Sequence, residues 1–271
     1  MARRLARVSS LVTYVEAALE VSKRWGPKQV WFRGHSKALT HRLLPSAYRL
    51  KEGEYHEARA FNEFWARGRA LRQFDQLDSN ADWDWYFAAR HHGLPNRLLD
   101  WSLSPIVALF FATEGGGNDE DHRVWVLDPC WMNKLLHDDE AIWMPHDSPL
   151  DKDMALWLPA DMDGKGNSQE ASVNNERPVA IYPAQTNDRL VAQMGMFTLH
   201  GKNRASLDEQ LAVLDSSETA RLGYIEIENG CAPFVHRDLR ALGVSPFSIY
   251  VDGKSLAETI TARHTSNVQC G

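Results

Sequence analysis

The chain has 271 residues, of which 44% are hydrophobic and 10% aromatic, a composition typical of a globular protein with enough apolar side chains for a large core. Its formal net charge of -6 argues against a general binder of nucleic-acid backbones, which would carry a basic stripe, but leaves a local basic pocket open. No apolar run reaches the roughly 18 residues of a membrane span, and the three cysteines, Cys130, Cys231 and Cys270, are too scattered for a disulfide framework or a zinc knuckle.

The first predicted elements bring an arginine to the end of a strand. Residues 10–25 carry apolar side chains at helical spacing up to a Gly-Pro pair, which predicts a helix. Residues 29–33 predict a short strand closed by a glycine, so Arg33 stands at a strand end, where sites are commonly built. A turn at residues 43–49 then leads into a tract through Leu77 whose Glu, Arg and Ala content predicts a long helix.

The central segment places polar side chains at a corner between a strand and a helix. Residues 82–90 predict a strongly apolar helix that delivers the pair His91–His92 to its C-terminal end. Residues 98–101 predict a short buried strand. After this strand, Ser102 or Ser104 can cap a new helix that has a proline in its first turn. Buried polar groups must be paired, so this cluster predicts a built polar site.

The second half of the chain is richer in strands. Between them, residues 187–193 form a polar connection that contains Arg189 and Gln193. We expect strands at residues 123–128, 179–183, 195–200 and 223–228, and a late helix at residues 233–243.

An acidic, Gly- and Asn-containing insertion, about residues 138–178, is expected to be a mobile surface segment. Residues 161–168 could pass for a calcium loop, but Ser172 stands where an EF-hand needs its glutamate. The chain shows no repeat and no convincing linker. We therefore predict one α+β domain over residues 1–271, with N-terminal helices around a mixed sheet.

The polar side chains of the two central strands each allow two interpretations. Arg33 beside Gly34 offers a bidentate fork next to a backbone that a phosphate can approach closely, or else an internal salt bridge. Asp100 is either the structural partner of Arg33 or Arg97, or a catalytic carboxylate. Ser102 is either a helix cap or a substrate contact, and the absence of Gly-x-Ser-x-Gly argues against a serine-hydrolase nucleophile.

The histidine pair and the later polar residues are equally open. Because adjacent side chains point in different directions, at most one of His91 and His92 is expected to face a ligand. No third ligand stands at metal spacing, so no metal is expected. Gln193 and Arg189 pair across a strand or hold a ribose. The aromatic side chains of Trp101 and its neighbours form either a stacking wall for a nucleotide or simply core.

Four separated blocks of this chain resemble the FRG-domain family. Phe32-Arg33-Gly34, within residues 31–36, corresponds to the motif that names the family. Residues 44–49 are similar to its proline-containing turn, residues 91–112 to its central signature, and residues 187–198 to its later block. The order of the four blocks makes the resemblance, over about residues 10–260, specific.

The resemblance implies a distant kinship with ADP-ribosyltransferases, in which a split β-sheet binds NAD in a central cleft. It implies that Arg33 with Gly34 holds an NAD phosphate and that Ser102 supports the nicotinamide ribose. Where arginine-type members have a catalytic glutamate, this chain has none in its later block. Gln193, Asp100 or Glu228 would then have to lie near the reacting carbon.

The resemblance thus predicts NAD as the substrate and a macromolecule as the acceptor of ADP-ribose. The further residues expected at the site are His92 in catalysis and Arg97, Trp101 and Arg189 against the cofactor. A bacterial toxin or defence effector is the setting that the resemblance suggests. The scattered cysteines fit the reducing cytoplasm.

Two other functions stay open. One is a non-catalytic module that uses the same pocket to bind a nucleotide or a partner. The other is metal-independent hydrolysis of a nucleotide or nucleic acid, with a histidine of the pair as general acid or base. No Gly-x-Gly-x-x-Gly and no Walker loop is present, so a Rossmann or P-loop site is not indicated.

Overall fold

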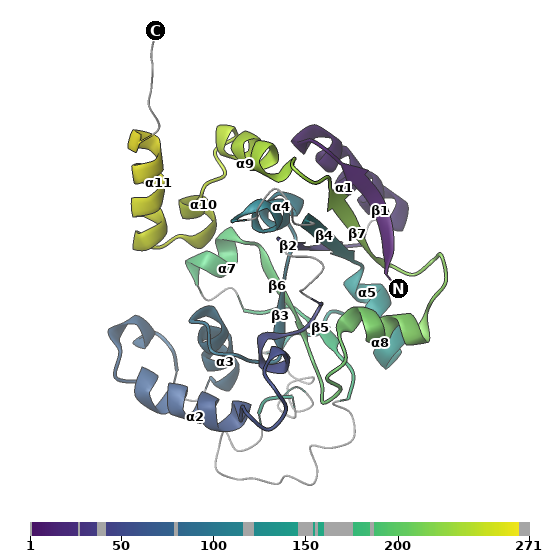
Figure 1. The fold of residues 1–271 in the computed structure, drawn as a ribbon. Coiled ribbons are helices and arrows are strands. Elements are labelled where there is room, and N and C mark those ends of the chain that lie inside the picture. Colours follow the sequence, from purple (N-terminus) through teal and green to yellow (C-terminus); the bar gives the residue numbers. More distant parts are fainter. Residues whose placement is uncertain are drawn as a thin grey trace.

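A mixed seven-stranded sheet organises the described part of the chain, which comprises residues 2–26, 28–36, 42–78, 81–115, 122–145, 154, 157–159, 176–184 and 187–265 of a computed structural model. The strand order is β1-β7-β4-β2-β3-β6-β5 (Figure 1). The only parallel ladder among these strands joins β1 to β7. The strands are β1 (Arg3–Val8), β2 (Trp31–His35), β3 (Leu98–Ser102), β4 (His122–Leu127), β5 (Val179–Ile181), β6 (Gly195–Leu199) and β7 (Leu222–Ile227).

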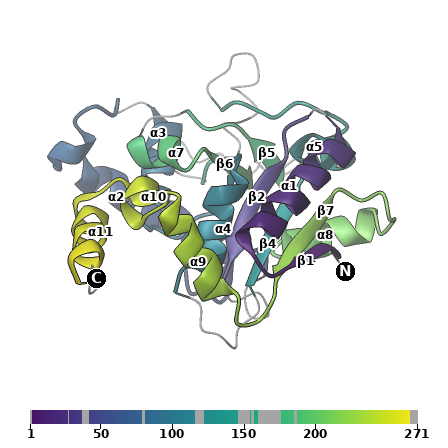
Figure 2. The same ribbon diagram turned by 90° about the horizontal axis from the view of Figure 1, so that it is seen from above.

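Helices cover both faces of the sheet, which confirms the predicted α+β class. Helices α2, α10 and α11 lie at the end of the molecule remote from β1 (Figure 1, Figure 2). The described helices are α1 (Leu11–Trp25), α2 (Glu57–Gly68), α3 (Asp82–His91), α4 (Pro105–Thr113), α5 (Pro129–His137), α7 (Asp188–Ala192), α8 (Leu207–Leu214), α9 (Ala232–Ala241), α10 (Pro246–Tyr250) and α11 (Gly253–Thr265), with 3-10 turns η1 (Ser46–Arg49) and η2 (Arg72–Phe74).

Alternation along the strands divides the buried side chains between two faces. On one face, Phe32 and Val124 pack with α1, α4 and α9, and beside them Leu98 packs with aromatic side chains of α2 and α3. On the opposite face, Leu99 and Trp101 pack with α5 and α8. No helix in the described part of the chain is both long and apolar enough to cross a bilayer.

The sheet is nearly divided between β2 and β3. These two strands share a single paired position, Phe32 with Ser102. In contrast, β2 pairs with β4 over five positions, and β3 pairs with β6 over five. Beyond the shared position a side chain takes the place of ladder bonds, because Arg33 Nη1 donates to the backbone carbonyl of Asp100 at 2.6 Å. The two halves of the sheet therefore diverge around a polar centre.

Several predictions of local structure were correct in kind but wrong in extent. The expected long helix through Leu77 is wrong, since α2 ends at Gly68, where a Cβ would lie 2.8 Å from the Trp85 ring. Ser104 is the residue that caps α4, accepting from the Val107 N–H at 3.3 Å. Strand β1 was not predicted, because its basic sequence resembles no half-buried strand.

The insertion expected at about residues 138–178 lies mostly outside the described residues. The same holds for the candidate calcium loop at 161–168 and for Cys270. The described residues at the beginning of the insertion include Trp143, which pairs with Ile181 in an isolated bridge.

Gly34 fixes how closely α4 approaches β2. A Cβ at this position would lie 2.0 Å from the carbonyl oxygen of Ala108 and 2.5 Å from the backbone nitrogen of Ala112. Both atoms belong to the helix backbone, so the overlap cannot be relieved by rotating a side chain. The close approach of strand and helix thus requires a glycine.

We expect Gly34→Ala to lower the free energy of unfolding by about 3 kcal/mol or more, because backbone must move to admit the methyl group. Urea denaturation monitored by circular dichroism measures the change. Gly253→Ala is the matched control, since open space surrounds that glycine, and it should leave the midpoint nearly unchanged. Equal stability of the two variants would contradict the packing argument.

Candidate functional site

A cavity of about 730 Å³ lies where β2 and β3 diverge. Its walls come from both strands, from η1, from the C-terminal end of α3 and from α4 and α7. Among the described residues that line it, the charged side chains are four arginines and one aspartate, namely Arg33, Arg49, Arg90, Arg189 and Asp100. The cavity is therefore strongly cationic, although the whole chain is acidic.

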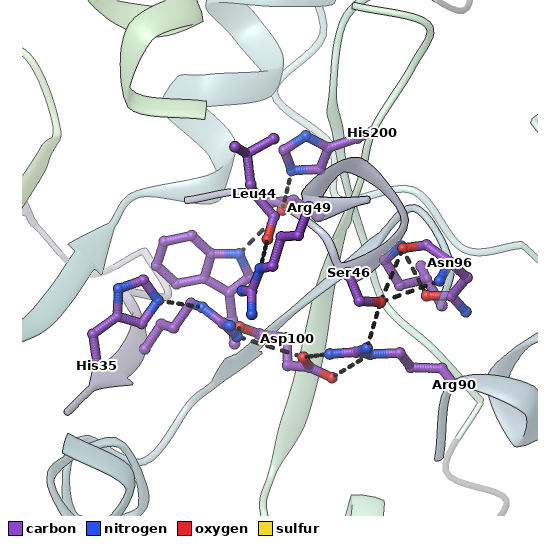
Figure 3. Close-up of polar contacts among 12 residues, drawn as sticks. His35, Leu44, Ser46, Arg49, Arg90, Asn96, Asp100 and His200 are labelled. Carbon is purple, nitrogen blue, oxygen red and sulfur yellow. Dashed lines mark hydrogen bonds and ion pairs between the residues drawn. The ribbon is translucent and has the colours of Figure 1, made fainter. Parts of the chain in front are cut away.

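Asp100 is held by two of these arginines (Figure 3). Arg90 Nε donates to Asp100 Oδ1 at 3.1 Å, and Arg90 Nη2 contacts Oδ2. Arg33 Nη1 lies 3.5 Å from Oδ2 in addition to its bond to the Asp100 backbone. Burial alone would raise the pKa of Asp100, but the charges of Arg90 and Arg33 and the Arg90 hydrogen bond hold it well below its usual range. The carboxylate is ionised and committed on both oxygens.

Arg33 is oriented from its other side by His35. Arg33 Nε donates to His35 Nε2 at 3.1 Å, while Trp125 Nε1 approaches His35 Nδ1 at 3.3 Å. A neutral imidazole has one acceptor nitrogen, so only one of the two contacts is a hydrogen bond in either tautomer. Burial lowers the pKa of Arg33 to about 10, with like charges of Arg49 and Arg90 contributing. The guanidinium stays charged at neutral pH.

Arg49 forms no ion pair with the carboxylates of the described residues, although the charge of Asp100 acts on it from a greater distance. Its Nε donates to the carbonyl of Leu44 at 3.1 Å, and none of the described carboxylates lies within 4.0 Å of it. Burial and the neighbouring charge of Arg90 lower its pKa. Arg90 also reaches η1, donating from Nη1 to Ser46 Oγ at 2.9 Å. Three guanidinium groups thus surround one carboxylate, an arrangement suited to an anion.

A second cationic region lies against α7 and the end of α3. The guanidinium of Arg189 stacks over the Tyr250 ring, 4.8 Å from its centroid. His91 and His92 both line the cavity, with ring centroids 4.8 Å apart; that at most one of them faces a ligand stays a prediction. The pair sits at the turn that ends α3, where both rings reach the same opening.

Both histidines are neutral at physiological pH. Burial lowers the pKa of His91 to about 4, and the charge of Arg189 adds to the effect. Burial and the charge of Arg189 also lower the pKa of His92. An imidazole with so low a pKa is a weak general base.

Ser102 and Gln193 line the cavity, but their polar groups hold the scaffold together. Ser102 Oγ donates to the backbone carbonyl of Gln193 at 2.6 Å and accepts from the Ser104 N–H at 2.9 Å. Gln193 Nε2 donates to the carbonyl of Ile249 at 3.1 Å. These bonds join the β3–α4 turn to α7 and α10.

Two residues expected to contact the cofactor have other surroundings. Arg97 lies outside the cavity lining, where its Nε donates to Glu57 Oε2 at 2.7 Å and its backbone N–H to Glu57 Oε1 at 3.0 Å. Trp101 contributes to the lining, but its indole N–H donates to Thr198 Oγ1 at 3.1 Å in the core of the opposite face.

The carboxylates expected to replace the missing glutamate do not meet in the cavity. Glu228 follows β7, which β4 separates from β2, and it lies 3.8 Å from Arg7. Glu226 pairs with Arg4 at 3.1 Å. Of the described residues, Asp100 is the one carboxylate that lines the cavity. The described chain also holds no group of three side chains placed to bind a metal ion.

The sequence arguments missed Arg49 and Arg90. Arg90 ends a predicted helix directly before the histidine pair, and Arg49 ends the second block of the family resemblance. Both arginines lie in segments with a predicted structure, but their spacing in the sequence does not show that they turn toward Asp100. Asp100 lies 10 residues after Arg90 and 51 residues after Arg49.

Comparison with known families supports the resemblance over about a third of the chain. Residues 28–121 match the family model of the FRG domain. No curated protein and no solved structure is similar enough to match. The matched segment contains Arg33, Arg49, Arg90 and Asp100, whereas Arg189 lies beyond it.

We expect Asp100→Asn to destabilise the protein at pH 7, because the guanidinium groups of Arg90 and Arg33 then lose their shared counter-ion. A depressed carboxyl pKa stabilises the folded state above the unfolded value of about 3.9, and this contribution is lost as the pH falls. The stability difference between the two proteins should therefore shrink below about pH 4. Thermal denaturation from pH 3 to pH 7 measures it, and a difference independent of pH would contradict the ion-pair assignment.

We expect Arg97→Met to cost about 3–5 kcal/mol of stability, because Glu57 would be left as an uncompensated, largely buried charge. The side chains of the pair are only 12% and 15% exposed. Arg67→Ala, which breaks the Arg67–Glu63 pair at 81% and 62% exposure, is the control and should cost less than about 1 kcal/mol. Chemical denaturation of both variants provides the comparison. A cost for Arg97→Met as small as the control's would show that the pair is not buried in solution.

Proposed function

We propose that the cavity binds NAD through its diphosphate and that the protein is an ADP-ribosyltransferase-like enzyme that cleaves the nicotinamide glycosidic bond. The observation that carries the proposal is that Arg33, Arg49 and Arg90 line one cavity with a single described carboxylate, Asp100, which pairs with Arg33 and Arg90 only. After that carboxylate is counted, the group keeps an excess of two positive charges, which matches the charge of a diphosphate.

The geometry favours a dinucleotide over a single phosphate ion. A volume of about 730 Å³ falls within the range of about 300–1,000 Å³ of small-molecule and cofactor sites. The partly buried Phe111 of α4 adds apolar surface to the lining, on which an aromatic ring of the ligand can rest.

The arginines are held in place before a ligand arrives. Arg33 is fixed by Asp100 and His35, and Arg90 by Asp100 and Ser46. A charged side chain that the folded protein already holds in one orientation loses little conformational entropy when it binds an anion. Asp100 acts here as a positioning residue for the two guanidinium groups.

The resemblance to the FRG family supports the reaction class. It associates Arg33 with a phosphate and Ser102 with the nicotinamide ribose, and these residues stand on two adjacent strands that meet at the cavity. Departure of nicotinamide leaves positive charge on the ribose, so the reaction needs a negative group near its C1′ atom.

A second function, binding without turnover, is favoured by the state of Asp100. Both of its oxygens are engaged by arginines, and no other carboxylate lines the described part of the cavity. A nucleotide-binding module would use the same arginines and need no free carboxylate. Measuring ligand binding and nicotinamide release on the same samples separates the two functions.

We expect NAD to raise the melting temperature of the protein, with Arg49→Ala weakening NAD binding about 10- to 100-fold, the equivalent of one charge-assisted contact. Arg237→Ala, at an exposed side chain of α9 that is 71% accessible, is the matched control and should bind like the wild type. Thermal shift against NAD concentration and nicotinamide release are the two measurements.

The enzyme proposal expects release that depends on Arg49. Binding without release would replace it by the nucleotide-binding module. No thermal shift with NAD would contradict both functions.

A further inference from the structure

The inner arginines do not account for all the positive charge of the cavity. Arg189 enters from α7 and lines the same cavity as His91 and His92 at the end of α3. No described carboxylate lies within 4.0 Å of the Arg189 guanidinium, whose neighbour is the ring of Tyr250 at 4.8 Å. Glu114 and Asp252 interact with the charge of Arg189 from beyond ion-pair distance, so the guanidinium itself remains available to an anion.

Contacts with α10 hold Arg189 in its position. Tyr250 of α10 carries the stacked guanidinium, and its hydroxyl contacts Glu114 at the end of α4. Gln193, one turn beyond Arg189, is bonded to the carbonyl of Ile249. Helix α10 therefore holds α7 and Arg189 at the edge of the cavity.

We propose, building on the function proposed above, that Arg189 and the neighbouring His91 form a second anion subsite, and that the acceptor of ADP-ribose is the terminal phosphate monoester of a nucleotide.

Charge balance supports a phosphate in this subsite. Four arginines and one aspartate give the described lining a net charge of +3. NAD brings two negative charges on its diphosphate and one positive charge on nicotinamide, which leaves two positive charges. A phosphate monoester carries about -2 near pH 7, so the complex with both substrates is close to neutral.

The lack of a suitable base for removing a proton also favours a phosphate acceptor. A hydroxyl or an ammonium acceptor must lose a proton, but Asp100 is committed to two arginines and His91 is a weak base. A phosphate oxygen is already ionised. Its lone pair forms the bond to C1′ of the ribose, the bond from C1′ to the nicotinamide nitrogen breaks, and the bonding electrons neutralise the pyridinium ring. No proton moves.

The same acceptor explains how the reaction proceeds without a glutamate near the ribose. An anionic nucleophile held by Arg189 brings negative charge to the carbon at which positive charge develops. Neutral imidazole of His91 can donate one N–H to a phosphate oxygen without repelling the arginine. The rings of Phe87 and Phe197 stack on one another in the wall of the cavity and are themselves buried, so they support the wall.

The acidic surface of the chain limits what the nucleotide belongs to. A net charge of -6 disfavours contact with a long phosphate backbone, so recognition is confined to a terminal group. A free nucleoside monophosphate and the 5′ end of a short oligonucleotide share this chemistry.

The test uses the full chain with NAD labelled in its adenylate phosphate. The acceptors are a 5′-phosphorylated oligonucleotide, the same oligonucleotide without the phosphate, a nucleoside monophosphate and a phosphoserine peptide. Nicotinamide release and the mass of the product are read together. We expect the label on the phosphorylated nucleotides alone, and the two nucleotide arms show whether the free or the polymeric form is preferred.

Arg189→Gln should reduce transfer to the phosphate at least tenfold while leaving the NAD-induced thermal shift in place, and Arg189→Lys should restore part of the transfer. Arg237→Ala should behave like the wild type. The thermal shift also reports that each variant is folded.

Three outcomes would overturn the inference. Equal labelling of the dephosphorylated oligonucleotide would show that the acceptor is not a phosphate. Labelling of the phosphopeptide in preference to the nucleotides would assign another acceptor class. Release of nicotinamide without label on any of the acceptors would mean that water is the nucleophile. The proposed cleavage of NAD would then stand, but the proposed phosphate acceptor would be wrong. Failure of NAD to bind at all would instead overturn the function on which the inference rests.

Discussion

The carboxylate of Asp100 is the charge on which the cavity depends. It binds Arg90 of α3 and Arg33 of β2, and through Arg90 it is linked to Ser46 of η1. Like-charged guanidinium groups repel one another strongly in a partly dry site. One shared counter-ion allows them to stand close together while still leaving an excess of positive charge. The result is a cationic cavity whose charged groups the fold holds in place.

The near division of the sheet makes room for this charge cluster. A continuous ladder between β2 and β3 would satisfy its backbone groups with one another. With a single paired position, the Asp100 carbonyl is free to accept from Arg33 instead. Gly34 then brings α4 against the strand on the other side. The irregularity in the sheet and the polar site are thus two aspects of one arrangement.

Local sequence patterns were sufficient to place Arg33 and Asp100 on strands and Ser102 at the following turn, because strand ends and helix caps are encoded by neighbouring residues. They were insufficient for contacts between distant segments. Arg97 was expected at the ligand, but its partner Glu57 stands 40 residues earlier. Arg49 and Arg90 acquire their meaning only when η1 and α3 pack beside β3. The single paired position between β2 and β3 has no local sequence signal.

The net positive charge of the cavity also limits which reactions it can support. A positive charge that develops on a ribose is disfavoured among uncompensated arginines, and the one carboxylate present is already paired. In the proposed reaction, each negative charge that is needed must then be brought by the substrates. The proposal gives the diphosphate to the inner arginines and leaves Arg189 on α7 for the anion that would approach the reacting carbon. A site in which the one described carboxylate is already paired would therefore favour acceptors that are themselves negatively charged.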